Sequence, residues 1–95
     1  MEYYRKALKI KEKLKGKESF DCTVTLHSIG FVYQNQGELN EALKSYRRAL
    51  RIYEKAKKDE SLDCANTLYN TGVVYYIQKE LNEALEYYNK ALSIK

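Results

Sequence analysis

The chain repeats its own sequence at an interval of 42 residues. Residues 38–43 read ELNEAL, and residues 80–85 read the same six letters. Further identities at this interval include Ser19 with Ser61, Cys22 with Cys64, and Gly30 with Gly72. A fixed period of this length is typical of stacked structural repeats. We therefore expect one domain over residues 1–95, with a full repeat at 17–58, a nearly full repeat at 59–95, and the closing helix of a partial repeat at 1–16.

Each repeat predicts a pair of α-helices, which we call the A helix and the B helix in chain order. The A helices are expected over residues 20–36 and 62–78, the B helices over 39–57 and 81–94, and a leading B helix over 2–15. Ser19 and Ser61 are good N-caps, and Gly37 interrupts the helical pattern of apolar residues. The chain contains no proline, which agrees with long helices and short loops. The predicted fold class is all-α, with five helices.

Two glycines lie in the middle of the predicted A helices. Gly30 and Gly72 each cost about 1 kcal/mol relative to alanine at such a position. This cost predicts that a second helix crosses each glycine closely, with Ala42 and Ala84 as the matching small residues. Tyrosines then fill the wider spaces beside the crossing. Because neither helix pair can bury its apolar faces alone, the repeats are expected to stack.

Residues 25–50 and 67–92 resemble tetratricopeptide repeats. The resemblance rests on seven signature positions in each repeat: Leu26, Ile29, Gly30, Tyr33, Ala42, Tyr46 and Ala49, then Leu68, Thr71, Gly72, Tyr75, Ala84, Tyr88 and Ala91. Thr71 departs from the pattern, which prefers leucine there. The resemblance implies a right-handed α-solenoid. The 42-residue length, in place of the common 34, and the D-x-x-x-T-L stretches at 21–26 and 63–68 are similar to kinesin light chains.

The same resemblance implies a concave groove lined by the A helices, which binds a peptide segment of a partner protein. Carried over by position, the lining residues are Val24, His27, Ser28, Phe31, Gln34, Asn35, Asn66, Tyr69, Asn70, Val73, Tyr76 and Ile77. Apolar and amide side chains together suit an extended or helical peptide. The alternative is that Phe31, Tyr76 and Ile77 are partly buried between repeats. No Lys or Arg occurs at these positions, which argues against a clamp for acidic chaperone tails.

Nothing in the sequence indicates an enzyme, a cofactor or a metal site. His27 is the single histidine and has no partner at ligand spacing. Cys22 and Cys64 occupy the same repeat position and are interpreted as small buried apolar residues rather than as a redox or metal pair. Two cysteines are too few for a disulfide scaffold, so a reducing, cytoplasmic location is expected. No apolar run reaches the length of a membrane span.

Three further hypotheses concern partners. The basic residues of 1–17 could form a patch for nucleic acid or acidic lipid, but no aromatic stacking platform accompanies them, so a solvated face is favoured. A structural or designed repeat with no dedicated ligand is the second possibility. The third is self-association through the terminal helices, by head-to-tail stacking or by exchange of the leading helix, because each end would expose apolar side chains.

Overall fold

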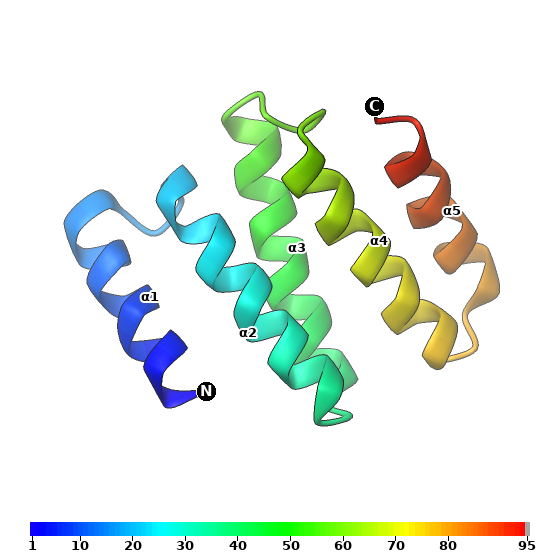
Figure 1. Ribbon diagram of the computed structural model, residues 1–95, viewed down its shortest axis with the longest axis horizontal. Coiled ribbons are helices and arrows are strands. Elements are labelled where there is room, and N and C mark those ends of the chain that lie inside the picture. The colour runs from blue at the N-terminus through cyan, green and yellow to red at the C-terminus, as the bar shows by residue number, and fades with distance from the viewer. Residues whose placement is uncertain (95) are drawn as a thin grey trace.

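The computed structural model describes residues 1–94 and is all-α. Its five α-helices are α1 (Glu2–Lys15), α2 (Thr23–Asn35), α3 (Leu39–Lys55), α4 (Leu62–Ile77) and α5 (Leu81–Leu92). A short 3₁₀ helix, η1 (Phe20–Cys22), lies directly before α2. The five predicted helices are therefore confirmed (Figure 1). The differences lie at the ends: the A helix expected from residue 20 starts with η1, and α3 and α5 stop two residues before their expected ends.

Local hydrogen bonds explain where the first A helix begins. The Ser19 hydroxyl accepts a hydrogen bond from the Asp21 backbone N–H at 3.2 Å, which confirms Ser19 as the cap but spans only two residues. The Thr23 hydroxyl donates to the Phe20 carbonyl at 2.8 Å. The first turn is therefore tight, and regular α geometry starts at Thr23. In the second repeat, Ser61 caps the Cys64 N–H at 3.2 Å, and α4 is α-helical from its first residue.

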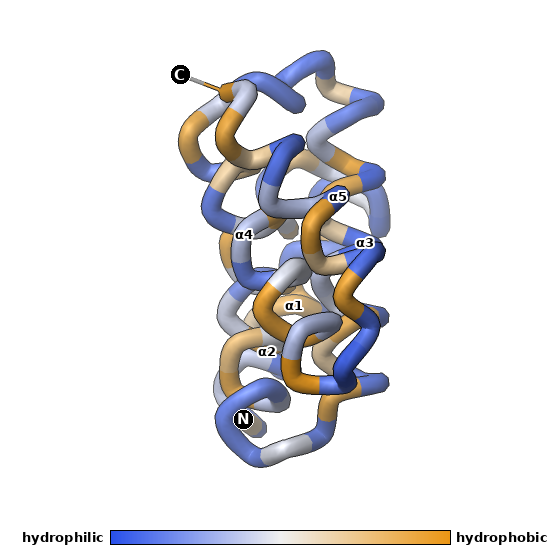
Figure 2. Tube along the Cα trace, turned by 90° about the vertical axis from the view of Figure 1, so that its right-hand side faces the viewer, coloured by the Kyte–Doolittle hydropathy of each residue, from blue (hydrophilic) through white to orange (hydrophobic). Residues whose placement is uncertain are grey.

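The helices form antiparallel pairs arranged in two layers. Helix α2 pairs with α3, and α4 pairs with α5. Figure 2 shows the A helices α2 and α4 along one side and the B helices α3 and α5 along the other. The molecule is a slab with extents of 38 × 30 × 15 Å. Both A helices therefore present one face along the same broad side of the slab.

The core lies on both sides of α3. One cluster joins the starts of α2 and α4 to the end of α3 and consists of Cys22, Leu26, Ala49, Ile52, Tyr53, Cys64 and Leu68. The other joins the opposite ends and consists of Ala42, Leu43, Tyr46, Val74, Tyr75 and Ala84. Both cysteines are buried and free, as predicted. Burial raises the pKa of the Cys64 thiol to about 11, which keeps it protonated and unreactive at neutral pH.

The two helical glycines mark close crossings, as predicted. A Cβ on Gly30 would lie 2.7 Å from a ring carbon of Tyr46, and one on Gly72 would lie 2.8 Å from the ring of Tyr88. The ring thus sits directly on the glycine rather than beside it, which differs from the expected arrangement. Each glycine is required because a tyrosine of the paired B helix occupies the place of its side chain.

The A-to-B turns share one geometry but not one residue. Gly37 ends the first A helix with φ 79°, and Lys79, 42 positions later, ends the second with φ 63°. After each, a backbone N–H closes the turn at 2.9 Å, from Glu38 to the Tyr33 carbonyl and from Glu80 to the Tyr75 carbonyl. Left-handed backbone is easy for glycine and strained for lysine. The second turn therefore has the same left-handed geometry as the first, but the backbone of Lys79 is strained in it.

Candidate protein-binding face

All twelve predicted groove residues lie on α2 and α4, in the A layer. The large apolar ones are open to solvent: Phe31 is 46% exposed, Tyr69 55%, Tyr76 60% and Ile77 50%. Val24, at 63%, is open as well. Burial between repeats therefore does not explain Phe31, Tyr76 and Ile77. Exposed aromatic and branched side chains gathered on one face are typical of an interaction surface.

His27 links the two A helices. Its Nδ1 lies 2.8 Å from the Thr67 hydroxyl oxygen, and its Nε2 lies 3.2 Å from the side-chain nitrogen of Asn70. The Thr67 hydroxyl donates its own proton to the Asp63 carbonyl at 3.2 Å. Its oxygen is left to accept, which assigns the imidazole proton to Nδ1 and makes Nε2 an acceptor from Asn70. Burial lowers the pKa of His27, so the ring is neutral at pH 7.

The predicted amides divide into engaged and open groups. Gln34 accepts a hydrogen bond from the buried Tyr46 hydroxyl at 2.7 Å, and Asn70 bonds to His27. Asn35 and Asn66 are exposed. Asn35 and Asn66 are therefore the amides placed to meet a peptide backbone, whereas Gln34 and Asn70 would have to exchange an existing partner.

A hollow follows the starts of the A helices. A cavity of about 150 Å³ between α2 and α4 is lined by Val24, His27, Ser28, Tyr53, Asp63 and Asn66. A neighbouring cavity of about 520 Å³ shares Val24 and Asp63 and reaches α1 and η1, where Lys11, Leu14, Lys15, Phe20, Asp21 and Thr23 line it. We call the two together the A-helix trough. The larger cavity combines apolar side chains with two lysines and two aspartates, and the smaller one is lined mostly by polar side chains.

The sequence reasoning missed the α1 end of the trough. Leu14 is 75% exposed and Phe20 41% exposed, and neither was assigned to the groove. Phe20 packs edge-on against Tyr53, with ring centroids 5.7 Å apart. A possible signal was that both are large apolar residues outside the repeated stripe. Lys11 and Lys15 also bring positive charge to a surface that was expected to have none.

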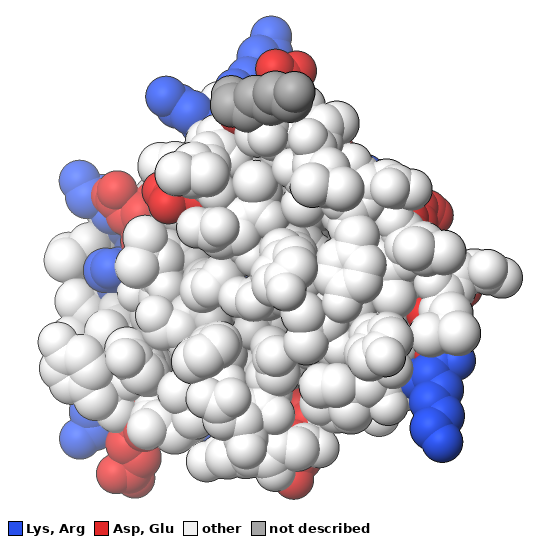
Figure 3. Space-filling view, turned by 45° about the vertical axis from the view of Figure 1, so that its right-hand side comes forward, with Lys and Arg blue, Asp and Glu red and all other residues white. Residues whose placement is uncertain are grey.

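A second exposed cluster joins α4 to α5. The ring centroids of Tyr69 and Tyr88 lie 5.4 Å apart. The pKa of Tyr88 is raised, chiefly by burial and to a smaller extent by the neighbouring hydroxyls of Tyr69 and Tyr76. Figure 3 shows that the side of the molecule around α4 and α5 is covered largely by uncharged side chains, with charged groups at its margins. This side of the molecule is thus largely uncharged.

A polar contact that recurs after 42 residues holds α1 against α2 and α3 against α4. Arg5 of α1 donates to the Tyr33 hydroxyl, and Arg47 of α3 donates to the Tyr75 hydroxyl. Each guanidinium also lies 5.8 Å from the centroid of the ring that it bonds. Helices α1 and α3 are therefore each tied to the following A helix by the same pair of side chains.

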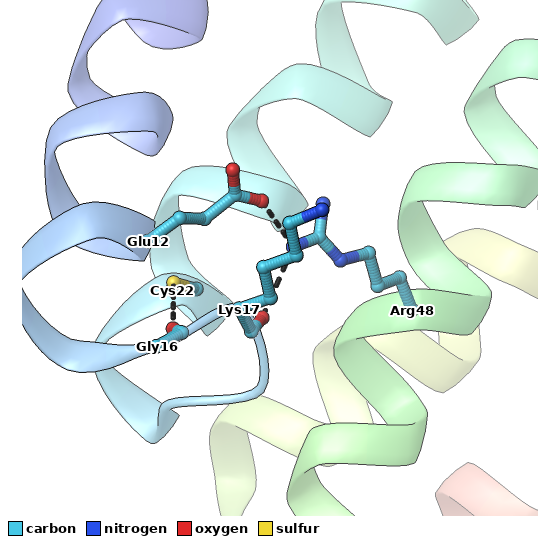
Figure 4. A network of polar contacts seen from close by, with 5 residues as sticks. All are labelled: Glu12, Gly16, Lys17, Cys22 and Arg48. Carbon is cyan, nitrogen blue, oxygen red and sulfur yellow. Dashed lines mark hydrogen bonds and ion pairs between the residues drawn. The ribbon is translucent and has the colours of Figure 1, made fainter.

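A further network ties α1 to α3 (Figure 4). The Arg48 guanidinium pairs with the Glu12 carboxylate and donates to the Lys17 carbonyl at 3.0 Å. Near it, the Cys22 thiol lies 3.7 Å from the Gly16 carbonyl oxygen. Lys55 pairs with Glu18 beside these contacts and lowers the pKa of that carboxyl. These contacts hold the loop that forms one end of the trough.

The opposite layer has a cavity of different character. It measures about 470 Å³ and lies among α3, α4 and α5, with charges of both signs at its rim, including Arg47, Arg51, Glu54 and Lys90. Within residues 1–94, no group of three or more His, Cys, Asp or Glu side chains is placed to hold a metal ion. Over the same residues, no helix combines the length and the apolar character that crossing a bilayer requires.

The family model described as tetratricopeptide repeat matches residues 21–95 of the chain. The matched range includes η1 except for Phe20, all four helices of the two pairs and the whole predicted groove, and it excludes α1. No curated protein matches the chain. The matched fold is non-catalytic and generally serves as a protein–protein interaction module.

Proposed function

Because the chain belongs to the tetratricopeptide repeat family, we propose that it is a scaffold that binds a peptide segment of a partner protein on the A-helix face. The observation that carries this proposal is the exposure of Phe31, Tyr69 and Tyr76 on helices that contain almost no charge. Large apolar side chains on an uncharged surface lose little by desolvation when a partner covers them. They are therefore suited to anchor a peptide.

The peptide would lie along the A-helix trough. Leu14, Phe20 and Val24 in its walls would receive one or two apolar side chains of the peptide. The larger cavity also contains charges of both signs, with Lys11 and Lys15 balanced by Asp21 and Asp63. Charges at the rim of such a site fix register more than they add affinity.

Three finer features belong to the same proposal. The 42-residue period and the D-x-x-x-T-L stretches support a likeness to the kinesin light chain repeats. Two free, buried cysteines support a reducing, cytoplasmic location. The absence of a catalytic constellation from the predicted site supports a role in binding rather than in an enzyme reaction.

Peptide selection on the immobilised chain, followed by calorimetric titration of the selected peptides, tests the proposal. Combined replacement of Phe31, Tyr69 and Tyr76 by serine should weaken binding at least about 100-fold, because aromatic anchors dominate such interfaces. Ile10→Ser is the matched control, since Ile10 is 59% exposed but lies on α1 outside the face. An equal loss of peptide affinity in both variants would show that the binding site does not lie on the A-helix face. Failure to select any peptide would favour the alternative of a structural repeat without a ligand.

A further inference from the structure

The B layer contains two grooves at equivalent places in the repeats. Helices α1 and α3 both pack on α2, and α3 and α5 both pack on α4, but among residues 1–94 no two of these B helices pack directly together. A cavity of about 520 Å³ lies between α1 and α3, and the cavity of about 470 Å³ described above lies between α3 and α5. We call them the first and the second B groove.

The lining of the first B groove recurs in the second. The first is lined by Glu12, Lys17, Glu18, Arg48, Arg51 and Ile52. The residues 42 positions later all line the second: Glu54, Asp59, Glu60, Lys90, Ser93 and Ile94. The first set has two carboxylates and three cations, whereas the second has three carboxylates and one lysine. The same place in the fold therefore differs in charge between the repeats.

A guanidinium of the chain itself occupies the first B groove. Arg48 pairs with the Glu12 carboxylate and donates to the Lys17 carbonyl at 3.0 Å (Figure 4). The pair is partly covered, since the side chain of Glu12 is 17% exposed and that of Arg48 31%. Beside it, Lys55 pairs with Glu18. Each carboxylate of the first B groove is therefore matched by a cation.

The second B groove keeps the carboxylate but not the guanidinium. Glu54 is the counterpart of Glu12 and is exposed. Lys90 is the counterpart of Arg48, but its ammonium nitrogen lies over the Tyr87 ring, 5.1 Å from the ring centroid. In the described part of the chain, neither Glu54 nor Lys90 takes part in an ion pair. The place that Arg48 fills in the first groove thus has no guanidinium in the second.

The loop beside the second B groove adds a further acid. Asp59 stands where the first repeat has Lys17. In both loops the N–H of the capping serine bonds to the carbonyl three residues earlier, at 3.2 Å for Ser19 and at 3.1 Å for Ser61. The loops therefore end alike, and Asp59 brings a carboxylate in addition to a backbone carbonyl.

The buried cysteines report the same difference in charge. Burial raises the thiol pKa of both. On Cys22, the paired carboxylate and guanidinium of the first B groove then act in opposite directions. On Cys64, Asp59 and Glu54 both raise the pKa further, and no cation among residues 1–94 offsets them. The two carboxylates thus act on one region of the second groove without a neutralising partner.

The two arginines that also line the second B groove are engaged elsewhere. Arg47 donates to the Tyr75 hydroxyl. Arg51 lines both grooves, and it adds to the effect of Lys55 in lowering the pKa of Glu18 in the first. Neither arginine forms an ion pair with the carboxylates of the second groove in the described structure.

We propose that the second B groove binds an arginine side chain of a partner protein, whose guanidinium contacts Glu54 and Asp59 as Arg48 contacts its partners in the first. The planar guanidinium presents several N–H donors in a fixed fork, so it bonds a carboxylate and a second acceptor together, which an ammonium does less well. Leu50 and Leu68 line the same cavity and would cover the methylene groups of the bound side chain.

This site lies in the layer opposite the A-helix face. It goes beyond the proposed binding of a peptide there and does not depend on it. A single partner could contact both layers, but each contact is measured separately, because the residues that respond to each are different.

Nuclear magnetic resonance titration of the purified chain with a capped peptide of one arginine between two alanines tests the proposal. The backbone amide resonances of residues 54–64 and 90–94 should shift saturably, and those of the A-helix face should not. The same peptide with citrulline keeps the shape of arginine without its charge and should cause no saturable shift. The lysine peptide should bind more weakly than the arginine peptide. Equal responses to arginine and to either of the other two peptides overturn the proposal.

Exchanges at exposed positions locate the site without disturbing the core. Glu54→Gln should weaken binding of the arginine peptide about tenfold, the size expected for a charge-assisted hydrogen bond. Lys90→Arg should abolish binding, because the chain would then fill its own groove as Arg48 does in the first repeat. Glu41→Gln is the matched control, since Glu41 lies on α3 outside both grooves, and it should bind as the unaltered chain does. Full affinity in the Glu54 or Lys90 variant, or an equal loss in the control, contradicts the assignment.

Discussion

Two tyrosines 42 residues apart show how the same residue acquires different roles in the two repeats. Tyr46 and Tyr88 both lie on a helical glycine of the paired A helix. Tyr46 is fully buried and its hydroxyl donates to Gln34, whereas Tyr88 is half-buried and leans on Tyr69. The difference arises from what lies outside the pair, because α4 covers the first tyrosine and no described residue covers the second in the same way. In a repeat protein, neighbours decide how much a contact contributes.

The glycines beneath these rings should give the largest difference. Gly30→Leu should destabilise the chain by about 3 kcal/mol, because the enclosed Tyr46 ring cannot move aside. Gly72→Leu should cost less, about 2 kcal/mol, because Tyr88 can rotate outward although the Ala84 carbonyl oxygen, 3.2 Å from the added Cβ, stays in place. Urea unfolding followed by circular dichroism measures both values. Equal losses would show that the two crossings are equally confined. Lys57→Ala, at an exposed position, serves as the reference and should change stability by less than about 0.5 kcal/mol.

Removal of the tyrosine hydroxyls should give the next largest difference. Tyr46→Phe leaves Gln34 without its donor in a poorly hydrated place and should cost about 1 kcal/mol. Tyr88→Phe should change stability by less than about 0.5 kcal/mol, because its hydroxyl is near solvent. Thermal unfolding of both variants compares them directly. A Tyr46→Phe variant as stable as the unaltered chain would mean that this bond contributes nothing net.

The A-to-B turns compare the repeats in the opposite direction, because here the second repeat is the strained one. Lys79→Gly should stabilise the chain by up to about 1 kcal/mol, since it relieves left-handed backbone at a side-chain-bearing residue. Gly37→Lys should destabilise it by a similar amount. The midpoint of chemical unfolding reports both. A destabilised Lys79→Gly variant would show that the entropy of the unfolded chain outweighs the relief of strain.

The smallest expected effect is a pH dependence located in the first repeat. Burial lowers the pKa of His27 in the folded chain, so the unfolded chain binds the proton more tightly. The stability that neutral His27 contributes is complete above the ordinary histidine pKa of about 6.5 and declines as the pH falls below it. His27→Gln should flatten this part of the stability profile between about pH 7 and about pH 5. An unchanged slope in that variant would assign the dependence to other groups.

The sequence predicted the helices well because the repeat supplied each of them twice. Ser19 and Ser61 marked the A-helix starts, and Gly30 and Gly72 marked the crossings. The position of the tyrosine rings was not predictable, since spacing along a helix does not say whether a ring lies on a glycine or beside it. Lys79 was missed as a left-handed residue because lysine gives no signal for that conformation.

The candidate site was predictable only in outline. The A-helix positions followed from the resemblance, and the structure places all twelve in one layer. The engagement of His27 with Thr67 and Asn70 required knowledge of which helices are neighbours, which a single sequence does not give. The trough end at Leu14 and Phe20 depends on the path of residues 16–19, a short loop whose course no repeat pattern specifies.

Helix α3 contributes six buried residues, α5 one and α1 none. Local opening free energies should therefore decline outward from α3, so that amide hydrogens exchange fastest in α1 and α5 and slowest in the middle of α3. Loss of order at an outer helix would leave the central α2–α3–α4 contacts intact. The molecule would then lose its structure by fraying inward along its length, in the manner of a short one-dimensional lattice, rather than by rupture of a single centre.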